Sequence, residues 1–290
     1  EIMAEAGLGD ALFANVDPNP NEINLAAGVA AYQAGGHDGV IAFGGGSGLD
    51  LGKMVAFMAG QTRPVWDFED IGDWWTRADA DAIAPIIVIA DPELTVGMPK
   101  FITAGTGLDA FAHCVEAYSS PHYHPMSQGI ALEGMRLVTT YLPRAYATPD
   151  DLEARAHMMA AAAMGATAFQ KGLGAIHAMS HPVGAVFNTH HGTTNAVCMP
   201  AVLAFNADTI RGRFDQAAAY LGIDGGFDGF CEFVQQFNDS FAIPRTLIEM
   251  GVSADRLDDL VAMALEDPSC GGNPVALTVE GLRGLFRACF

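Results

Sequence analysis

The sequence predicts two domains, an α/β domain with a parallel sheet followed by an all-helical domain. Residues 24–59 alternate helical and strand signals around a run of glycines. After about Asp91 the strand signals nearly vanish, and long segments rich in Ala, Leu and Met replace them. Half of the 290 residues are hydrophobic and 17% are charged, so a large core can be buried. We expect the domains to span residues 1–98 and 99–290.

The elements of the first domain follow in the order helix, strand, glycine turn, helix, strand. Residues 24–34 have helical composition, and residues 40–43 (Val-Ile-Ala-Phe) predict a short buried strand. Beyond the glycines, residues 49–59 predict a helix and residues 86–89 (Ile-Ile-Val-Ile) predict a second strand. This alternation is typical of a parallel sheet whose strands are joined by helices.

The second domain is predicted to contain helices only. Capping residues precede two of them, Thr148-Pro149-Asp150 in one case and Ser253 in the other. The segments with helical periodicity are 107–119, 126–141, 150–170, 173–187, 193–206, 212–221, 227–240, 253–265 and 278–288.

The charge of the chain argues against two classes of partner. With 34 acidic and 14 basic residues the formal charge is −20, and such a surface repels nucleic-acid phosphates and anionic lipids. Solubility is the ordinary reason for such a charge. The five cysteines show no Cys-x-x-Cys spacing, which indicates reduced thiols in a cytoplasmic protein. No apolar run reaches the length of a membrane span.

The glycine run after the first predicted strand is a candidate phosphate site. Glycines let the backbone approach a ligand closely, and the helix that follows offers free N–H groups and the positive end of its dipole. A flexible turn that needs small residues explains the run equally well, because it matches neither a Gly-x-Gly-x-x-Gly fingerprint nor a Walker loop. The candidate residues are Gly44, Gly45, Gly46, Ser47, Asp50 and Lys53.

A carboxylate and an imidazole four residues apart indicate a metal site. Asp109 and His113 share one face of a predicted helix, so both can reach one ion. A buried histidine hydrogen-bonded to an aspartate one turn away is the competing interpretation.

Two further histidine pairs strengthen the metal interpretation. His177 and His181 repeat the four-residue spacing in an apolar helix, and His190 and His191 follow where one helix ends and another begins. One carboxylate oxygen with several imidazole nitrogens suits Fe²⁺ or Zn²⁺ and leaves room for a substrate oxygen.

Five stretches of the sequence, in the same order, resemble the iron-containing (group III) alcohol dehydrogenases. The resemblance extends over nearly the whole chain, and several long motifs in the right order are more specific than any single one. The stretches are 41–53 (IAFGGGSGLDLGK), 91–95 (DPELT), 106–118 (TGLDAFAHCVEAY), 172–181 (GLGAIHAMSH) and 191–196 (HGTTNA).

The resemblance implies a Rossmann-like nucleotide-binding domain, a helical metal-binding domain and reversible oxidation of an alcohol with NAD or NADP. It implies Fe²⁺, with Zn²⁺ as the alternative, and the family spacing selects His191 rather than His190. His181 matches a catalytic pocket histidine, and the glycine run matches the segment that holds the cofactor pyrophosphate. We also expect a homo-oligomer such as a dimer, and a small alcohol or aldehyde as substrate. The implied metal ligands are Asp109, His113, His177 and His191.

The chain departs from this family in two places. The family usually has a Thr/Gly-rich cofactor loop directly after the strand matched by residues 86–89, but here Ala90 runs straight into Asp91. That loop, the hairpin after it and the opening strands of the nucleotide-binding domain are missing. Either the sequence is the ordered part of a longer protein, or the chain is a relative with a genuine deletion and a defective cofactor site.

Two other functions compete with alcohol oxidation. A metal- and NAD-dependent lyase of the dehydroquinate-synthase type has a related two-domain build. Such a lyase needs more basic residues than this chain has, because they hold a phosphorylated substrate. The chain has 14 Lys and Arg, and none of them clusters near the histidines. The other competitor is a non-catalytic metal-binding relative. Maleylacetate reductases share the fold but lack this ligand set.

Overall fold

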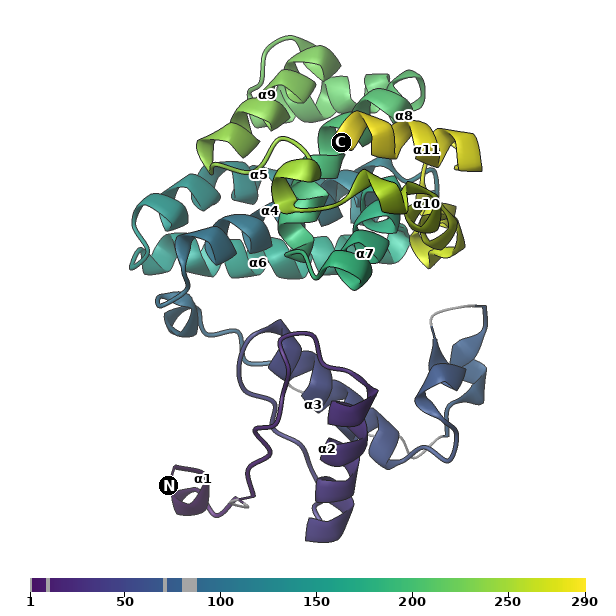
Figure 1. The fold of residues 1–290 in the computed structure, drawn as a ribbon. Coiled ribbons are helices and arrows are strands. Elements are labelled where there is room, and N and C mark those ends of the chain that lie inside the picture. Colours follow the sequence, from purple (N-terminus) through teal and green to yellow (C-terminus); the bar gives the residue numbers. More distant parts are fainter. Residues whose placement is uncertain (1, 9–10, 70–71, 80–87) are drawn as a thin grey trace. The chain divides into compact units, whose positions relative to one another are not determined.

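The computed structural model describes residues 2–8, 11–69, 72–79 and 88–290, which divide into two compact units. The first unit spans residues 1–89 and the second spans residues 90–290 (Figure 1). None of the helices described is both long and apolar enough to cross a membrane.

The two helices predicted in the first unit are formed, and they pack against each other. α2 (Glu22–Gly35) begins after Asn21, whose side chain caps the first backbone N–H groups. α3 (Gly46–Ala59) lies against it at Gly28, where a β-carbon would come within 2.6 Å of Val55. The shorter helices of this unit are α1 (Ile2–Glu5), η1 (Val65–Phe68) and η2 (Trp74–Arg77).

The strand predicted at residues 40–43 is not formed. These residues carry no regular secondary structure, and no strand occurs in the described ranges of the chain. A strand needs a neighbour that completes its hydrogen-bond ladder, and residues 86 and 87 of the other predicted strand lie outside the described residues. Val40 and Ala42 instead lie against α3, since a β-carbon at Gly52 would come within 2.5 Å of Ala42 and 3.7 Å of Val40, whereas Ile41 and Phe43 are exposed. The parallel sheet remains a prediction.

Residues 90–290 fold into helices and connecting turns with no strand in that range, as predicted. The helices are α4 (Lys100–Ser119), α5 (Pro125–Ala147), α6 (Leu152–Ala168), α7 (Ala175–Phe187), α8 (His191–Leu221), α9 (Gly226–Ser240), α10 (Leu257–Glu266) and α11 (Val279–Cys289). Short 3₁₀ turns connect them, namely η3 (Pro92–Thr95), η4 (Phe169–Lys171), η5 (Ile248–Met250), η6 (Ala254–Arg256) and η7 (Pro268–Gly272).

The longest helix differs from its prediction. Residues 193–206 and 212–221 are predicted as two helices, but α8 runs unbroken over 31 residues. The polar residues between the two segments indicate, in the sequence, that one helix ends and another begins. In the structure Ile210 within that stretch is only 2% exposed, so the apolar stripe that a buried helix needs continues through it.

Aromatic side chains from three helices meet inside the second unit. Phe111 of α4, Phe214 of α8 and Phe230 of α9 are at most 1% exposed. The ring centroids of Phe214 and Phe230 are 4.9 Å apart, and those of Phe111 and Phe230 are 6.2 Å apart. Ring contacts of this kind add to the free energy of apolar burial. The cluster therefore holds together α4 and α8, two of the helices that carry predicted site residues.

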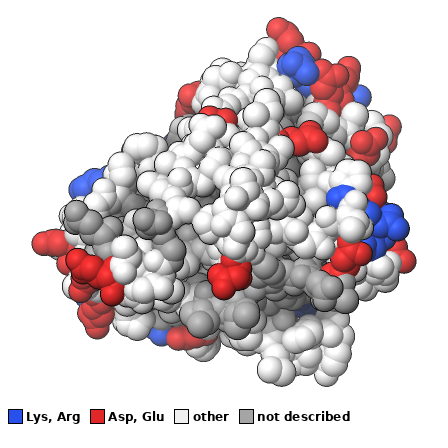
Figure 2. Space-filling model, turned by 90° about the horizontal axis from the view of Figure 1, so that it is seen from below, with Lys and Arg blue, Asp and Glu red and all other residues white. Residues whose placement is uncertain are grey.

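Basic side chains on the surface are mostly paired with acidic ones. In Figure 2 the blue side chains appear as separate spots, most of them beside red side chains. In the second unit the Arg144 guanidinium lies 2.9 Å from Asp151 and 2.6 Å from Glu153. A cation paired in this way offers little positive potential to a phosphate backbone.

Replacing Phe230 with Ala is expected to lower the free energy of unfolding by about 3–5 kcal/mol, because it leaves a cavity among packed rings. Urea denaturation followed by circular dichroism measures this loss. Phe101→Ala serves as the control, since Phe101 lies on α4 but is 67% exposed. Equal destabilisation by the two changes would show that the ring cluster does not anchor these helices.

Candidate metal centre

One face of α4 presents three ionisable side chains. Asp109, His113 and Glu116 follow one another at spacings of four and three residues, which places them in one stripe along the helix. The side chains of Asp109 and His113 are 24% and 17% exposed, whereas that of Glu116 is 4% exposed. The stripe therefore runs from a partly open end into the interior.

Glycines allow α8 to reach α4 at this stripe. At Gly192 a β-carbon would come within 2.0 Å of the carbonyl oxygen of Gly105 and within 2.8 Å of the β-carbon of Asp109. At Gly105 a β-carbon would come within 2.4 Å of the His190 ring. The two helix backbones thus touch beside Asp109, and this contact brings His191, the first residue of α8, to that carboxylate.

The start of α7 is fixed by side chains that also reach the site. The N–H of Ile176 donates to Glu116 Oε1 at 2.6 Å, and the preceding N–H donates to Asn273 at 3.1 Å. Gly174 makes room for both acceptors, because a β-carbon there would lie 2.9 Å from Asn273 and 3.1 Å from Glu116. These acceptors satisfy N–H groups that a helix start leaves unpaired, and they set the position of His177.

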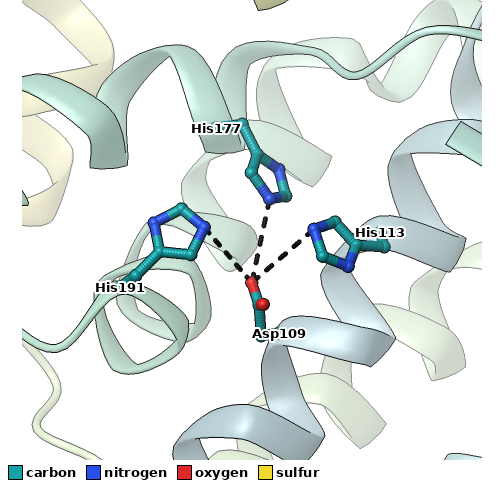
Figure 3. A group of neighbouring side chains, drawn as sticks. All are labelled: Asp109, His113, His177 and His191. Carbon is teal, nitrogen blue, oxygen red and sulfur yellow. Dashed lines mark ion pairs between the residues drawn. The ribbon is translucent and has the colours of Figure 1, made fainter. Parts of the chain in front are cut away.

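Four side chains from these helices converge on one point (Figure 3). Asp109 Oδ1 lies 3.4 Å from Nε2 of His191, 3.8 Å from Nε2 of His177 and 3.9 Å from Nε2 of His113. One ligand atom from each of the four lies within 4.8 Å of the others. Ligands on opposite sides of an ion bound at about 2.0–2.2 Å lie roughly 4 Å apart, so the group has the size that one divalent ion needs.

Glu116 fixes the orientation of the His177 ring from behind. Glu116 Oε2 lies 2.5 Å from Nδ1 of His177, and both side chains are buried. A carboxylate on one ring nitrogen leaves the other nitrogen free to face an ion and makes it more basic. Nε2 of His177 is therefore aimed at Asp109.

Three of these ligand atoms surround one side-chain nitrogen. Nδ2 of Asn195 lies 2.7 Å from Asp109 Oδ1 and 3.1 Å from Nε2 of both His177 and His191. A single N–H₂ group thus occupies a position that three ligand atoms share. Such a position also suits a cation, and one carboxylate oxygen with imidazole nitrogens suits Fe²⁺ or Zn²⁺. The residues present therefore fit a divalent ion.

The close approach of carboxylates and imidazoles shifts their pKa values. Burial lowers the pKa of His177, but the charges of Glu116 and Asp109 and hydrogen bonds to them raise it more, to about 9. Burial lowers the pKa of His191 to about 4 and also lowers that of His113. Burial raises the pKa of Asp109, but its hydrogen bond with His177 and the nearby imidazoles hold it well below its ordinary range. At neutral pH only His177 of these three histidines holds a second proton.

His181 lies beside the four-residue group rather than within it. Its ring stacks on that of His191 with centroids 5.4 Å apart, and its Nδ1 lies 2.7 Å from Asp267 Oδ2. Its side chain is 43% exposed and lines an open pocket together with Met263 of α10. Burial raises the pKa of Asp267, but the hydrogen bond with His181, the charge of that ring and hydrogen bonds from Ser269 together hold it below its ordinary value. The carboxylate is therefore ionised at neutral pH.

His190, the neighbour of His191, caps the start of α8. It precedes the first turn of α8, where its Nδ1 accepts a hydrogen bond from the N–H of Thr193 at 3.3 Å. The structure therefore brings His191 rather than His190 to Asp109.

The predicted cofactor residues lie together at the start of α3 in the first unit. Gly44 has φ 141°, a conformation that side chains disfavour. Gly45 and Gly46 lead into the helix, and no side chain caps its first N–H groups. Lys53 Nζ lies 2.8 Å from Asp50 Oδ1 on the exposed side of the helix.

Three residues at the centre were not predicted from the sequence, namely Glu116, Asn195 and Asp267. Helical spacing could have found two of them, because Glu116 lies three residues after His113 and Asn195 lies four after His191. No local pattern points to Asp267, which lies 86 residues from His181 in the chain.

Two family models match the chain. The model described as "Iron-containing alcohol dehydrogenase" matches residues 1–92. The model described as "Fe-containing alcohol dehydrogenase family, C-terminal" matches residues 103–290.

Individual relatives are similar over almost the whole chain. The 4-hydroxybutyrate dehydrogenase of Cupriavidus necator is 34% identical over 332 aligned residues, which cover 99% of this chain and 86% of that protein. The NAD-dependent methanol dehydrogenase of Bacillus methanolicus is 30% identical, with 98% and 86% covered. Since 332 exceeds the 290 residues of this chain, the first alignment includes positions at which the relative alone has a residue.

A solved structure shows that the likeness extends to the fold. The crystal structure of a 1,3-propanediol oxidoreductase has a TM-score of 0.90 and 27% sequence identity, and the match covers 99% of this chain and 86% of that chain.

Replacing Glu116 with Gln is expected to weaken Zn²⁺ binding by about 10–100-fold, because the charge that orients and polarises His177 is lost. Competition with a chromophoric chelator measures the affinity. Glu153→Gln is the control, since the Glu153 side chain is 64% exposed and pairs only with Arg144. Unchanged Zn²⁺ affinity in Glu116→Gln would exclude the assigned role of this carboxylate.

Zn²⁺ binding is expected to tighten about tenfold for each pH unit between roughly pH 6 and pH 8. Below the pKa of about 9 of His177 the ion must displace one proton from that ring. His191, whose pKa is lowered to about 4, and His113, whose pKa is also lowered, contribute little to this proton release. Chelator competition at several pH values gives the slope. An affinity that does not change with pH would mean that no proton leaves His177 on binding.

Proposed function

The chain belongs to the iron-containing alcohol dehydrogenase family, and we propose that it is a metal-dependent, NAD(P)-linked dehydrogenase that interconverts a small alcohol and its aldehyde or ketone. The observation that carries the proposal is the convergence of one carboxylate oxygen and three imidazole nitrogens within 4.8 Å of one another. No family motif is needed to see that this group can hold one divalent ion.

The proposed ligands of that ion are Asp109, His113, His177 and His191. A divalent ion held there supplies a Lewis acid that polarises an alcohol or carbonyl oxygen. Other parts of the protein hold these ligands in position. Glu116 holds the His177 ring at 2.5 Å, and the backbone contact between α4 and α8 holds His191 beside Asp109. We propose Fe²⁺ as the natural ion, with Zn²⁺ as the alternative, because a site of nitrogen and carboxylate ligands accepts both.

His181 is proposed to move a proton at its Nε2. Its Nδ1 faces the ionised carboxylate of Asp267 at 2.7 Å, which keeps the proton on that nitrogen and leaves Nε2 able to accept one. The ring is also partly exposed in an open pocket beside His191. This arrangement connects the edge of the metal centre to solvent through a base whose orientation is fixed.

The start of α3 is proposed to bind the pyrophosphate of NAD or NADP through residues 44–47. Backbone N–H groups without a side-chain cap, preceded by three glycines, suit a phosphate at the positive end of a helix dipole. The Ser47 hydroxyl donates to the backbone carbonyl of Pro18, so it ties the start of α3 to the segment that precedes α2. We assign residues 1–98 to cofactor binding and residues 99–290 to metal binding and catalysis.

A short-chain primary alcohol is the proposed substrate. Two relatives that are similar over almost the whole chain are named for 4-hydroxybutyrate and methanol, and a similar solved structure is named for 1,3-propanediol. Each of these compounds carries a terminal hydroxyl. Because each of these relatives is an oxidoreductase, they favour alcohol oxidation over the lyase alternative. A cytoplasmic homo-oligomer remains our prediction for the assembly.

Replacing His191 with Ala is expected to lower alcohol-dependent formation of NADH or NADPH by at least about 100-fold and to lower bound metal in parallel, because a ligand is lost. Absorbance at the nicotinamide band with methanol, 1,3-propanediol and 4-hydroxybutyrate, in the presence of Fe²⁺ or Zn²⁺, measures turnover.

His190→Ala is the matched control, because it removes the adjacent imidazole, which caps α8 and is not among the four grouped ligands. It should keep both metal and turnover. A His191→Ala protein that turns over alcohols without bound metal would refute the proposed role of the ion.

A further inference from the structure

The open pocket beside the metal centre is lined by one carboxylate and by no Lys or Arg. Its lining comes from α7 and from the end of α10, and consists of His181, Pro182, Ala185, Met263 and Asp267. Asp267 is the acidic member of this set, and its carboxylate is ionised at neutral pH. A molecule that enters the pocket therefore meets apolar side chains, an imidazole and a negative charge.

The helices that form the pocket add no positive charge. α7 contains no Asp, Glu, Lys or Arg, whereas α10 contains three acidic residues and no basic one. Arg256 and Arg283 lie beside the start of α10, but each is paired with an aspartate there. The opposite end of α10, which leads into Asp267, presents the negative end of the helix dipole. On the α10 side the pocket therefore has negative potential.

The pocket adjoins the metal centre through His181. The ring of this residue lines the pocket and stacks on the ring of His191, a proposed ligand, with centroids 5.4 Å apart. A primary alcohol whose hydroxyl lies at the ligand group would extend its carbon chain past His181. The far end of the alcohol would then lie in the pocket that Asp267 lines.

We infer that the enzyme prefers alcohols whose far end is uncharged, such as diols, and discriminates against alcohols that end in a carboxylate. This inference rests on the proposed function and narrows its substrate class. Proteins usually recognise a carboxylate with the paired donors of Arg or with Lys. Here a carboxylate would face the charge of Asp267 instead, and bringing like charges together weakens binding. The second hydroxyl of a diol is uncharged and can donate a hydrogen bond.

Two four-carbon alcohols test the inference, because 1,4-butanediol and 4-hydroxybutyrate differ mainly in the charge of one end. We would measure kcat/KM for each with NAD or NADP and Fe²⁺ or Zn²⁺, with and without added KCl. Saturation-transfer NMR gives the Kd of each alcohol without the nicotinamide cofactor, so binding is measured apart from turnover.

Two variants of α10 complete the design. Met263→Lys introduces a cation into the pocket at a side chain that is 41% exposed. Leu265→Lys is the matched control, because it adds the same charge to the same helix at a side chain that is 39% exposed and is not among the lining residues.

Wild type is expected to favour 1,4-butanediol by about tenfold or more, both in kcat/KM and in Kd. Added KCl should reduce this preference, because salt screens the repulsion. Met263→Lys should reduce it about tenfold by attracting the carboxylate, whereas Leu265→Lys should keep the wild-type ratio. Circular dichroism checks folding. If Met263→Lys does not fold, the wild-type ratio and its dependence on KCl still decide the question.

Three results would overturn the inference. Equal or better use of 4-hydroxybutyrate would show that the pocket accepts an anion, as the name of one relative indicates for that protein. A preference for the diol that KCl leaves unchanged would mean that charge is not its cause. Equal effects of the two lysine variants would mean that the far end of the substrate does not lie at Met263. If wild type oxidises neither alcohol, the proposed function itself fails, whereas the three other results leave it intact.

Discussion

The candidate centre depends on one backbone contact, between Gly105 of α4 and Gly192 of α8. A β-carbon at position 192 would come within 2.0 Å of the Gly105 carbonyl oxygen, so any larger residue must force the helices apart. Asp109 lies one turn from Gly105, and His191 directly precedes Gly192. The closeness of the two backbones therefore sets the distance between a carboxylate and an imidazole that are 82 residues apart in the chain.

Glu116, which contacts the ligand His177 and is not itself a proposed ligand, is constrained because its charge is buried. Glu116 is 3% exposed, and an unpaired carboxylate at such a place would cost several kcal/mol. It has two partners instead, the N–H of Ile176 and the ring of His177. One carboxylate thus fixes both the start of α7 and the direction of an imidazole. Folding of the second unit and formation of the centre are linked through this residue.

Local spacing accounts for the part of the centre that the sequence predicts. Asp109 and His113 share a helix face wherever that helix packs, so their pairing needs no knowledge of the fold. The clustered histidines indicated that further imidazoles join these two, but the choice of His177 and His191 among them came from the family resemblance. Asp267 was missed because its contact with His181 arises only from the packing of the helices. The parallel sheet stays unsettled for a related reason, since a strand requires a partner distant in sequence.

The central claim is that Asp109 and three histidines hold one divalent ion. Anomalous diffraction from crystals of the full-length chain grown with Zn²⁺, recorded on both sides of the zinc absorption edge, tests it most directly. The account predicts one strong peak about 2.0–2.2 Å from Asp109 Oδ1 and from Nε2 of His113, His177 and His191. A chain that shows no peak at this position, or whose zinc lies elsewhere in the molecule, would contradict the account.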